Sequence, residues 1–235
     1  MKALRWPFGV TIAASLIIIA VALHLWGAEE VRADVAQVFF LTALGAVWLI
    51  LATLVFSWFG ISYRDDVVER RNVAALIALC GAILGVALLY AGGSLGEGDS
   101  YWDNIFSAGL GTAGVFGLWI VLELGAQVSR SIAEERDLAS GLRLGGFLLA
   151  IGLVLGRATA GNWVSAMATV RDFFHDGWPA GVLCALALGI EKFARPSRQC
   201  PLPKWSNRGL FPALLYLALG AAWLRHLGAW EGMPE

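Results

Sequence analysis

The chain has 235 residues, of which 58% are hydrophobic and only 15% are charged. Soluble domains carry about 25% charged residues, so this composition excludes an ordinary soluble protein and places most of the chain in lipid. The formal net charge is −1. We therefore expect the lipid bilayer as a partner, and we expect no nucleic-acid partner.

Seven apolar stretches follow one another along the chain, and a helix needs about 20 such residues to cross the hydrocarbon core. They cover approximately residues 7–26, 35–61, 73–92, 105–126, 142–160, 179–193 and 210–227. No small-residue cleavage site closes the first stretch, which we interpret as a retained helix. The sequence predicts an all-α, polytopic transmembrane bundle of about seven helices, with one integral membrane domain over residues 1–235.

The sixth stretch is the weakest, because residues 179–193 are too few to span unless Gly177 and Trp178, or part of the segment before Arg171, extend it. The number of spans is therefore six or seven. Residues 162–178 mix aromatic and charged side chains. This mixture is typical of a partly buried outer loop or a short interfacial helix, which serves as a gate, as a partner surface or simply as an aromatic belt.

Basic residues gather in alternate loops, and such residues near helix ends are retained on the cytoplasmic side of a membrane. With the N-terminus in the cytoplasm, 13 of the 17 basic residues are cytoplasmic. The sequence thus predicts a multi-pass protein of a bacterial-type inner membrane with a cytoplasmic N-terminus. The far side then holds only Arg32, Arg157, Arg171 and Arg225.

The segment from 192 to 208 contains three of the seven prolines, Pro196, Pro201 and Pro203, and has no apolar periodicity. Clustered prolines without such a pattern indicate a connection and not a helix. We predict a cytoplasmic linker there.

Two junctions where a charged loop enters an apolar helix, at positions 69–75 and 134–140, align when the chain is shifted against itself. We predict two helix-loop-helix units, approximately residues 35–92 and 105–160, that form a parallel repeat about an axis along the membrane normal. The repeated cytoplasmic motif consists of Glu69, Arg71 and Asn72 in the first copy and of Glu134, Arg136 and Asp137 in the second.

The motif has an interpretation that requires no function. Asn72 and Asp137 stand where a helix begins, and a short acceptor side chain there satisfies an otherwise unpaired amide of the first turn. The glutamates and arginines can then pair across the two loops at the membrane surface. Alternatively, the charged loops bind a partner, either a second copy of the chain or another membrane protein.

These junctions carry a resemblance to a known family. The first copy, Glu69, Asn72, Ala74 and Ala75 entering a Gly-rich helix, and its repeat resemble the bacterial inner-membrane family known as domain of unknown function 350, the YjfL-like proteins. The resemblance covers approximately residues 39–160, and the second copy departs from it by having Asp137 where the first has Asn72. It implies helix-pair units in bacterial membranes and no assigned reaction, so no catalytic residue carries over.

Three ionisable side chains, Glu123, Arg143 and Arg157, fall inside apolar stretches. A charged group at that depth must pair, face water or extend to the interface. At 3.6 residues per turn, Arg143 and Arg157 lie nearly four turns apart and within about 40° of one helix face. They form, with Glu123, a candidate polar pathway. The alternative is that both arginines extend to the interfaces and that Glu123 does the same or pairs with Arg143.

Motifs for chemistry are absent from the sequence. His24, His175 and His226 have no metal-ligand spacing, and there is no P-loop, dinucleotide fingerprint, nucleophile elbow or paired-cysteine zinc motif. We expect no metal, no cofactor and no catalytic residue. Glycines spaced four residues apart, as at Gly81 and Gly85 or Gly141 and Gly145, predict close helix contact within the bundle or at a dimer seam.

Two hypotheses for function follow. Intramembrane charge and duplication favour a small transporter or channel subunit for ions or protons. The repeated charged loops favour a non-catalytic membrane scaffold that binds a partner. Convergence of the candidate pathway residues on a continuous cavity would favour transport, whereas a dry core packed through glycines would favour the scaffold.

Overall fold

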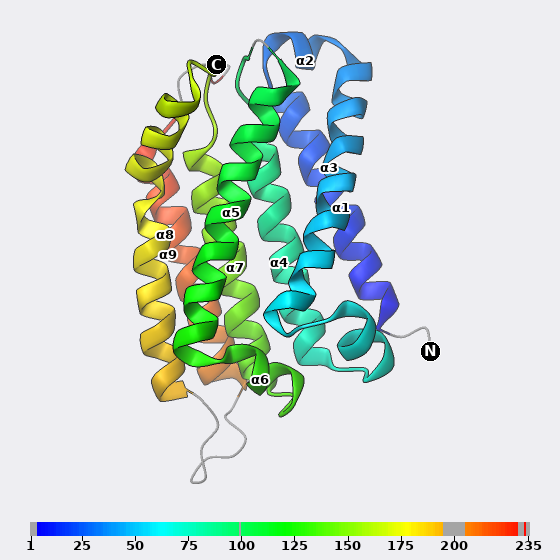
Figure 1. Cartoon of the computed structure of the whole chain (residues 1–235), viewed down its shortest axis with the longest axis vertical. Coiled ribbons are helices and arrows are strands. Elements are labelled where there is room, and N and C mark those ends of the chain that lie inside the picture. The colour runs from blue at the N-terminus through cyan, green and yellow to red at the C-terminus, as the bar shows by residue number, and fades with distance from the viewer. Residues whose placement is uncertain (1–3, 99, 195–204, 230–232, 234–235) are drawn as a thin grey trace.

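In the computed structural model, the described residues, 4–98, 100–194, 205–229 and 233, form helices joined by short connections, and no strand occurs among them (Figure 1). Seven helical stretches are long and apolar enough to cross a membrane. The protein is therefore a multi-pass membrane protein with an all-α bundle, as the sequence predicts. The helices that lie wholly within spans are α1 (Arg5–Trp26), α3 (Val35–Phe56), α4 (Val73–Gly92), α5 (Tyr101–Ala126), α7 (Leu138–Ala158), α8 (Ala166–Ala194) and α9 (Phe211–Leu227).

Short helices mark the two ends of the bundle. We call the end with α6 (Val128–Ala133) and the π-helical turns η2 (Tyr63–Glu69) and η3 (Ser206–Leu210) the basic side; it is at the bottom of Figure 1. The opposite end carries α2 (Glu29–Ala33) and the connections at 93–100 and 159–165, and we call it the acidic side. A 3₁₀ turn, η1 (Ser57–Phe59), extends the second span toward the basic side.

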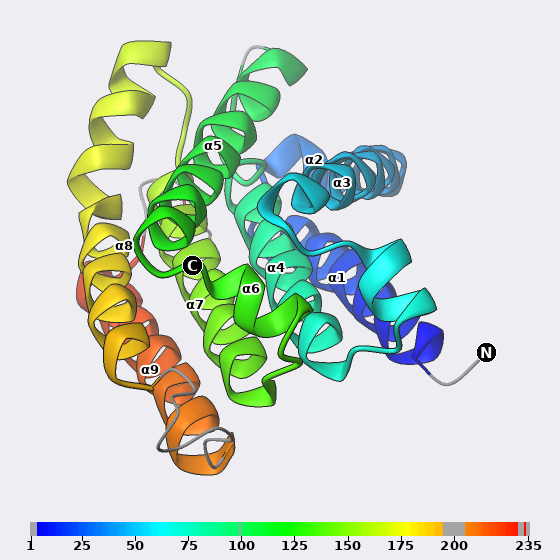
Figure 2. The same ribbon diagram turned by 60° about the horizontal axis from the view of Figure 1, so that its bottom comes forward.

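Helices α4 and α7 form the centre of the bundle, and the others surround them (Figure 2). In their most apolar windows 72% and 78% of the residues of α4 and α7 are buried, compared with 22–39% in the other five spans. The two backbones touch: a Cβ added to Gly81 would overlap the Gly145 carbonyl oxygen, and one added to Gly92 would overlap that of Gly156. The predicted glycine contact is therefore confirmed within the bundle.

Equivalent positions of the two aligned junctions have the same local structure on the basic side. Helices α4 and α7 begin at Val73 and Leu138, and the residues two positions earlier, Arg71 and Arg136, both have left-handed backbones, with φ of 54° and 55°. In each copy the following backbone N–H reaches back along the chain, to the carbonyl oxygen of Asp66 in the first and of Ser131 in the second, at 2.9 and 3.0 Å. The two junctions thus fold alike.

Helix α8 is longer than the apolar stretch at 179–193, because the segment before that stretch extends it, an alternative that the sequence leaves open. It begins at Ala166 and continues through Pro179, so most of the predicted outer segment at 162–178 is its first half and the sixth span has 29 residues. A proline inside a helix removes one backbone hydrogen bond. Contacts of Phe173 with Gly114 and of Gly177 with Leu155 hold this half against α5 and α7.

The predicted linker at 192–208 lies largely outside the described residues. Within them, residues 192–194 still belong to α8 and residues 206–208 belong to η3. Helix α8 ends later, and the next helical segment begins earlier, than the apolar pattern indicates.

Candidate functional site

Helix α7 carries an arginine near each end, and both arginines form ion pairs with acidic residues of α8. Arg143 lies near the basic side and pairs with Glu191, whereas Arg157 lies near the acidic side and pairs with Asp176. Because α8 runs antiparallel to α7, Arg157, the later arginine of α7, pairs with Asp176, the earlier carboxylate of α8. The two ion pairs therefore join the same two helices near the opposite faces of the membrane.

The pair on the basic side is buried. Arg143 and Glu191 have side chains only 1% and 3% exposed. Arg143 Nε and Nη2 donate to Glu191 Oε1 and Oε2 at 2.5 and 2.9 Å, so the pair is bidentate. Arg143 Nη1 also donates to the carbonyl oxygen of Arg208. Bidentate charge-assisted bonds are among the strongest that side chains form, which offsets part of the cost of removing both charges from water.

Three more side chains complete this region. Arg143 Nη2 donates to Ser140 Oγ at 2.8 Å, and Ser140 Oγ donates to the Asp137 carboxylate at 2.6 Å. The Tyr216 hydroxyl, from α9, is buried and has no hydrogen-bond partner among the described residues. We call Asp137, Ser140, Arg143, Glu191 and Tyr216 the basic-side cluster. It connects α7, α8 and α9 at one membrane face.

The pair on the acidic side is looser. Arg157 Nη1 lies 3.8 Å from Asp176 Oδ2, and the two side chains are 10% and 23% exposed. Arg157 Nη2 also lies 3.4 Å from the carbonyl oxygens of Gly228 and Ala229. His175 Nδ1 lies 2.8 Å from Asp176 Oδ1. This arrangement resembles a side chain that extends to the interface, as one sequence alternative states.

Glu123 has a local structural role. Its carboxylate accepts hydrogen bonds from the backbone N–H of Ser129, at 3.0 Å, and from the Ser129 hydroxyl, at 2.5 Å. These bonds close the turn between α5 and α6, where Gln127 has a left-handed backbone with φ of 47°. The predicted alternative that Glu123 pairs with Arg143 is wrong, because Arg143 bonds to Glu191 instead.

The structure does not bring the three candidate pathway residues together. Glu123 and Arg143 lie near the basic side and each bonds to different partners. Arg157 stands nearly four turns from Arg143 along α7, a rise of about 21 Å. Between them α7 lies against α4 through glycines, where a Cβ on Gly152 would overlap the backbone of Gly85.

The repeated motif divides into buried and exposed residues. Asn72 and Asp137 are buried and cap α4 and α7, each accepting two backbone N–H groups of the first turn, as the sequence predicts. Asn72 Nδ2 also donates to the Ile132 carbonyl oxygen at 2.6 Å, so it joins the two copies. The remaining motif residues are exposed, namely Glu69, Arg71, Glu134 and Arg136.

The exposed glutamates pair within their own loops. Glu69 lies 3.5 Å from Arg64, and Glu134 lies 3.1 Å from Arg130. The predicted pairing across the two loops is therefore wrong: each glutamate has an arginine nearby in its own loop. Such exposed pairs contribute little stability, which leaves these side chains available to a partner.

Within the described part of the chain, no group of three or more histidine, cysteine, aspartate or glutamate side chains is placed to hold a metal ion. His24 and His226 lie near the acidic-side ends of α1 and α9. His226 stacks near Trp223, with ring centroids 5.2 Å apart.

The family model described as Domain of Unknown Function (DUF350) matches residues 30–159, more than half of the chain. The chain belongs to the DUF350 family. No curated protein and no solved structure matches it. The match runs from α2 to α7 and includes both loop-to-helix junctions, in agreement with the resemblance seen in the sequence. The DUF350 region contains Arg143 and Arg157 but not the α8 carboxylates with which they pair.

Sequence reasoning missed Glu191, which stands next to Lys192 at the start of the proposed linker. One signal could have found it. The interval between the arginines at 143 and 157 on one helix nearly equals that between the carboxylates at 176 and 191 on the next, antiparallel helix.

Proposed function

We propose that this DUF350 protein is a non-catalytic scaffold of a bacterial-type inner membrane that binds a protein partner through its two repeated loops on the basic side. The basic side faces the cytoplasm in this proposal, and so does the N-terminus. The sequence assigns 13 of the 17 lysines and arginines to loops on the cytoplasmic side, which supports this orientation.

One observation carries the proposal: the two junctions have the same fold and expose the same kinds of charged side chain. Arg64 and Glu69 in the first loop are 85% and 59% exposed, and Arg130 and Glu134 in the second are 64% and 65% exposed. The matching caps and left-handed residues support an internal duplication. Two like surfaces side by side suit a partner with two like sites, including a second copy of this chain.

The interior supports a structural role over transport. The backbones of α4 and α7 touch. Each candidate pathway residue already bonds or pairs with a neighbouring part of the chain: Glu123 with Ser129, Arg143 with Glu191 and Arg157 with Asp176. A centre in which glycines let two helix backbones touch favours stability of the bundle over passage of ions.

Site-specific photocrosslinking tests the scaffold. A photoreactive residue at Arg64 or at Arg130 is expected to give the same discrete crosslinked product, and Glu69→Lys with Glu134→Lys is expected to abolish it. The matched control is Val182, which is 54% exposed on the lipid-facing surface of α8 and is expected to give no such product. Absence of a product from both loops would contradict the proposal.

Transport is the second candidate, because the buried Arg143–Glu191 pair lies beside the unpartnered Tyr216 hydroxyl near one membrane face. Proton, sodium and potassium flux in liposomes distinguishes the two functions. We expect no flux for the wild-type protein. Robust flux that is lost in Glu191→Gln would instead make the protein a transporter and would overturn the scaffold.

A further inference from the structure

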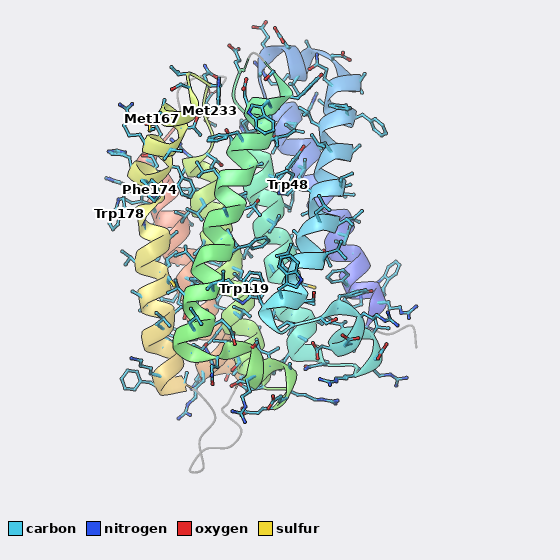
Figure 3. All side chains as sticks on the ribbon, in the orientation of Figure 1. Trp48, Trp119, Met167, Phe174, Trp178 and Met233 are labelled. Carbon is cyan, nitrogen blue, oxygen red and sulfur yellow. The ribbon has the colours of Figure 1, made fainter. Side chains whose placement is uncertain are left out.

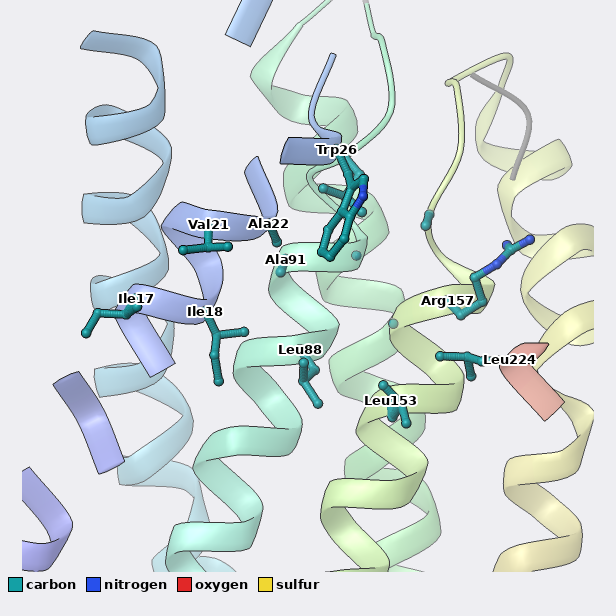
Figure 4. Close-up of a pocket in the computed structure, with 14 residues that line it drawn as sticks. Ile17, Ile18, Val21, Ala22, Trp26, Leu88, Ala91, Leu153, Arg157 and Leu224 are labelled. Atoms are coloured by element: carbon teal, nitrogen blue, oxygen red, sulfur yellow. The ribbon is translucent and has the colours of Figure 1, made fainter. Parts of the chain in front are cut away.

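An apolar groove of about 470 Å³ lies between α1 and α9 (Figure 4). Its floor comes from α4 and α7, where small residues such as Ala91, Gly92 and Gly156 give it depth, and its walls include Ile18 and Val21 of α1 and Leu224 of α9. Arg157 contributes the one charged side chain of the lining. The groove is thus an apolar surface that the described residues leave uncovered.

The groove begins at the acidic-side membrane face and continues into the span. Trp26 is the last residue of α1, and Arg157 and Leu224 lie in the last turns of their helices. The four helices that form the groove all cross the membrane. The hydrocarbon core holds no water, so a groove at that depth would face lipid chains. A tryptophan at its upper end is typical of the interfacial region where lipid headgroups lie.

Positive charge lies at this upper end. The stem of Arg157 lines the groove, and its guanidinium points away from the apolar lining (Figure 4). Arg32 Nε donates to the carbonyl oxygen of Gly27, the residue after Trp26, at 2.9 Å. No carboxylate among the described residues lies within ion-pair distance of Arg32, whereas Asp176 offsets part of the charge of Arg157. Arg157 therefore lines the groove, and Arg32 bonds to the turn that follows Trp26, on a helix that also carries the exposed Glu29 and Glu30.

We propose that the groove binds an acyl chain of an anionic phospholipid from the acidic-side leaflet, with the lipid phosphate near Arg32 and Arg157. The apolar lining selects the chain, and the arginines select the charge. This site is independent of the proposed partner surface, which lies on the opposite membrane face.

Native mass spectrometry of the purified full chain tests the site. The protein is mixed with equal amounts of phosphatidylglycerol and phosphatidylethanolamine vesicles, then extracted in mild detergent. We expect at least about fivefold more phosphatidylglycerol to remain bound, which corresponds to about 1 kcal/mol. Equal retention of the two lipids, or no retained lipid, would overturn the proposal.

Two variants separate the chain from the charge. Leu153→Trp places a ring in the groove and is expected to abolish retention, while Val21→Trp fills it from the exposed wall and serves if the first variant does not fold. Arg32→Gln is expected to remove the preference for phosphatidylglycerol but to keep a bound lipid.

Matched controls are Val182→Trp on the exposed face of α8 and Arg171→Gln on the acidic side, where Arg171 is 79% exposed and pairs with Asp172. Both are expected to bind lipid as the wild type does. A dimer that disappears in Leu153→Trp would assign the groove to a second copy of the chain and refute the lipid site.

Discussion

Each end of α7 is joined to α8 by an ion pair, and the two ion pairs differ in how deeply they are buried. Near the basic side Arg143 is 1% exposed and makes a bidentate pair with Glu191, which is 3% exposed. Near the acidic side Arg157 lies 3.8 Å from a partly exposed Asp176. A buried pair is costly to break because one charge is left without a partner, whereas an exposed pair exchanges its partner for water. One ion pair at each end of α7 therefore does not mean that the two ends are equally stable. Figure 3 shows the side chains of the described residues on the ribbon.

The largest effect is expected from Glu191→Ala. This change removes the bidentate partner of the buried Arg143 guanidinium and leaves only the Asp137 carboxylate, 4.0 Å away, and we expect a loss of about 3–5 kcal/mol in the free energy of unfolding. Denaturant titration in mixed micelles measures it. The control is the double variant Arg143→Met with Glu191→Met, which removes both charges and is expected to lose much less. A loss for Glu191→Ala below about 1 kcal/mol, the range of an exposed pair, would refute the importance of burial.

An intermediate effect is expected from Asp137→Ala at the same end of α7. The change removes the helix cap, the acceptor of Ser140 and a carboxylate 4.0 Å from Arg143, at a cost of about 1–2 kcal/mol. Asp137→Asn is the matched control for the cap, because asparagine caps α4 at the equivalent Asn72. It removes the charge but keeps the cap, and we expect it to lose less. Faster amide exchange at Ala139 and Ser140 in the alanine variant alone would locate the loss at the cap. Equal losses in both variants would contradict this explanation.

The smallest effect is expected from Asp176→Asn at the acidic-side end. A partly exposed pair contributes at most about 1 kcal/mol, and dissolved salt screens it. The same denaturant titration at low and high salt checks this: the loss is expected to shrink with salt, whereas that of Glu191→Ala is expected to remain. A salt-independent loss larger than that of Asp137→Ala would show that the two ends of α7 do not differ as described.

Local features of the sequence predicted much of the fold. Apolar length predicted the seven spans but not all of their bounds. The largest difference is that α8 continues through Pro179, because contacts of Phe173 and Gly177 with other helices outweigh the local effect of a proline. The caps Asn72 and Asp137 were predictable because capping involves residues two or three positions apart. The glycine contacts of α4 and α7 were predictable from four-residue spacing.

The sequence by itself determined that this chain crosses a membrane and where α4 and α7 begin. It also determined that the junctions before these two helices have the same local structure. Each of these features depends on residues that are neighbours in the chain. Only the tertiary structure decided which charges meet. Arg143 and Glu191 are far apart in the chain, and Trp26 and Arg157 flank one groove from helices that are also distant in sequence. Such contacts depend on how helices are arranged around the α4–α7 pair, and no local pattern specifies that arrangement.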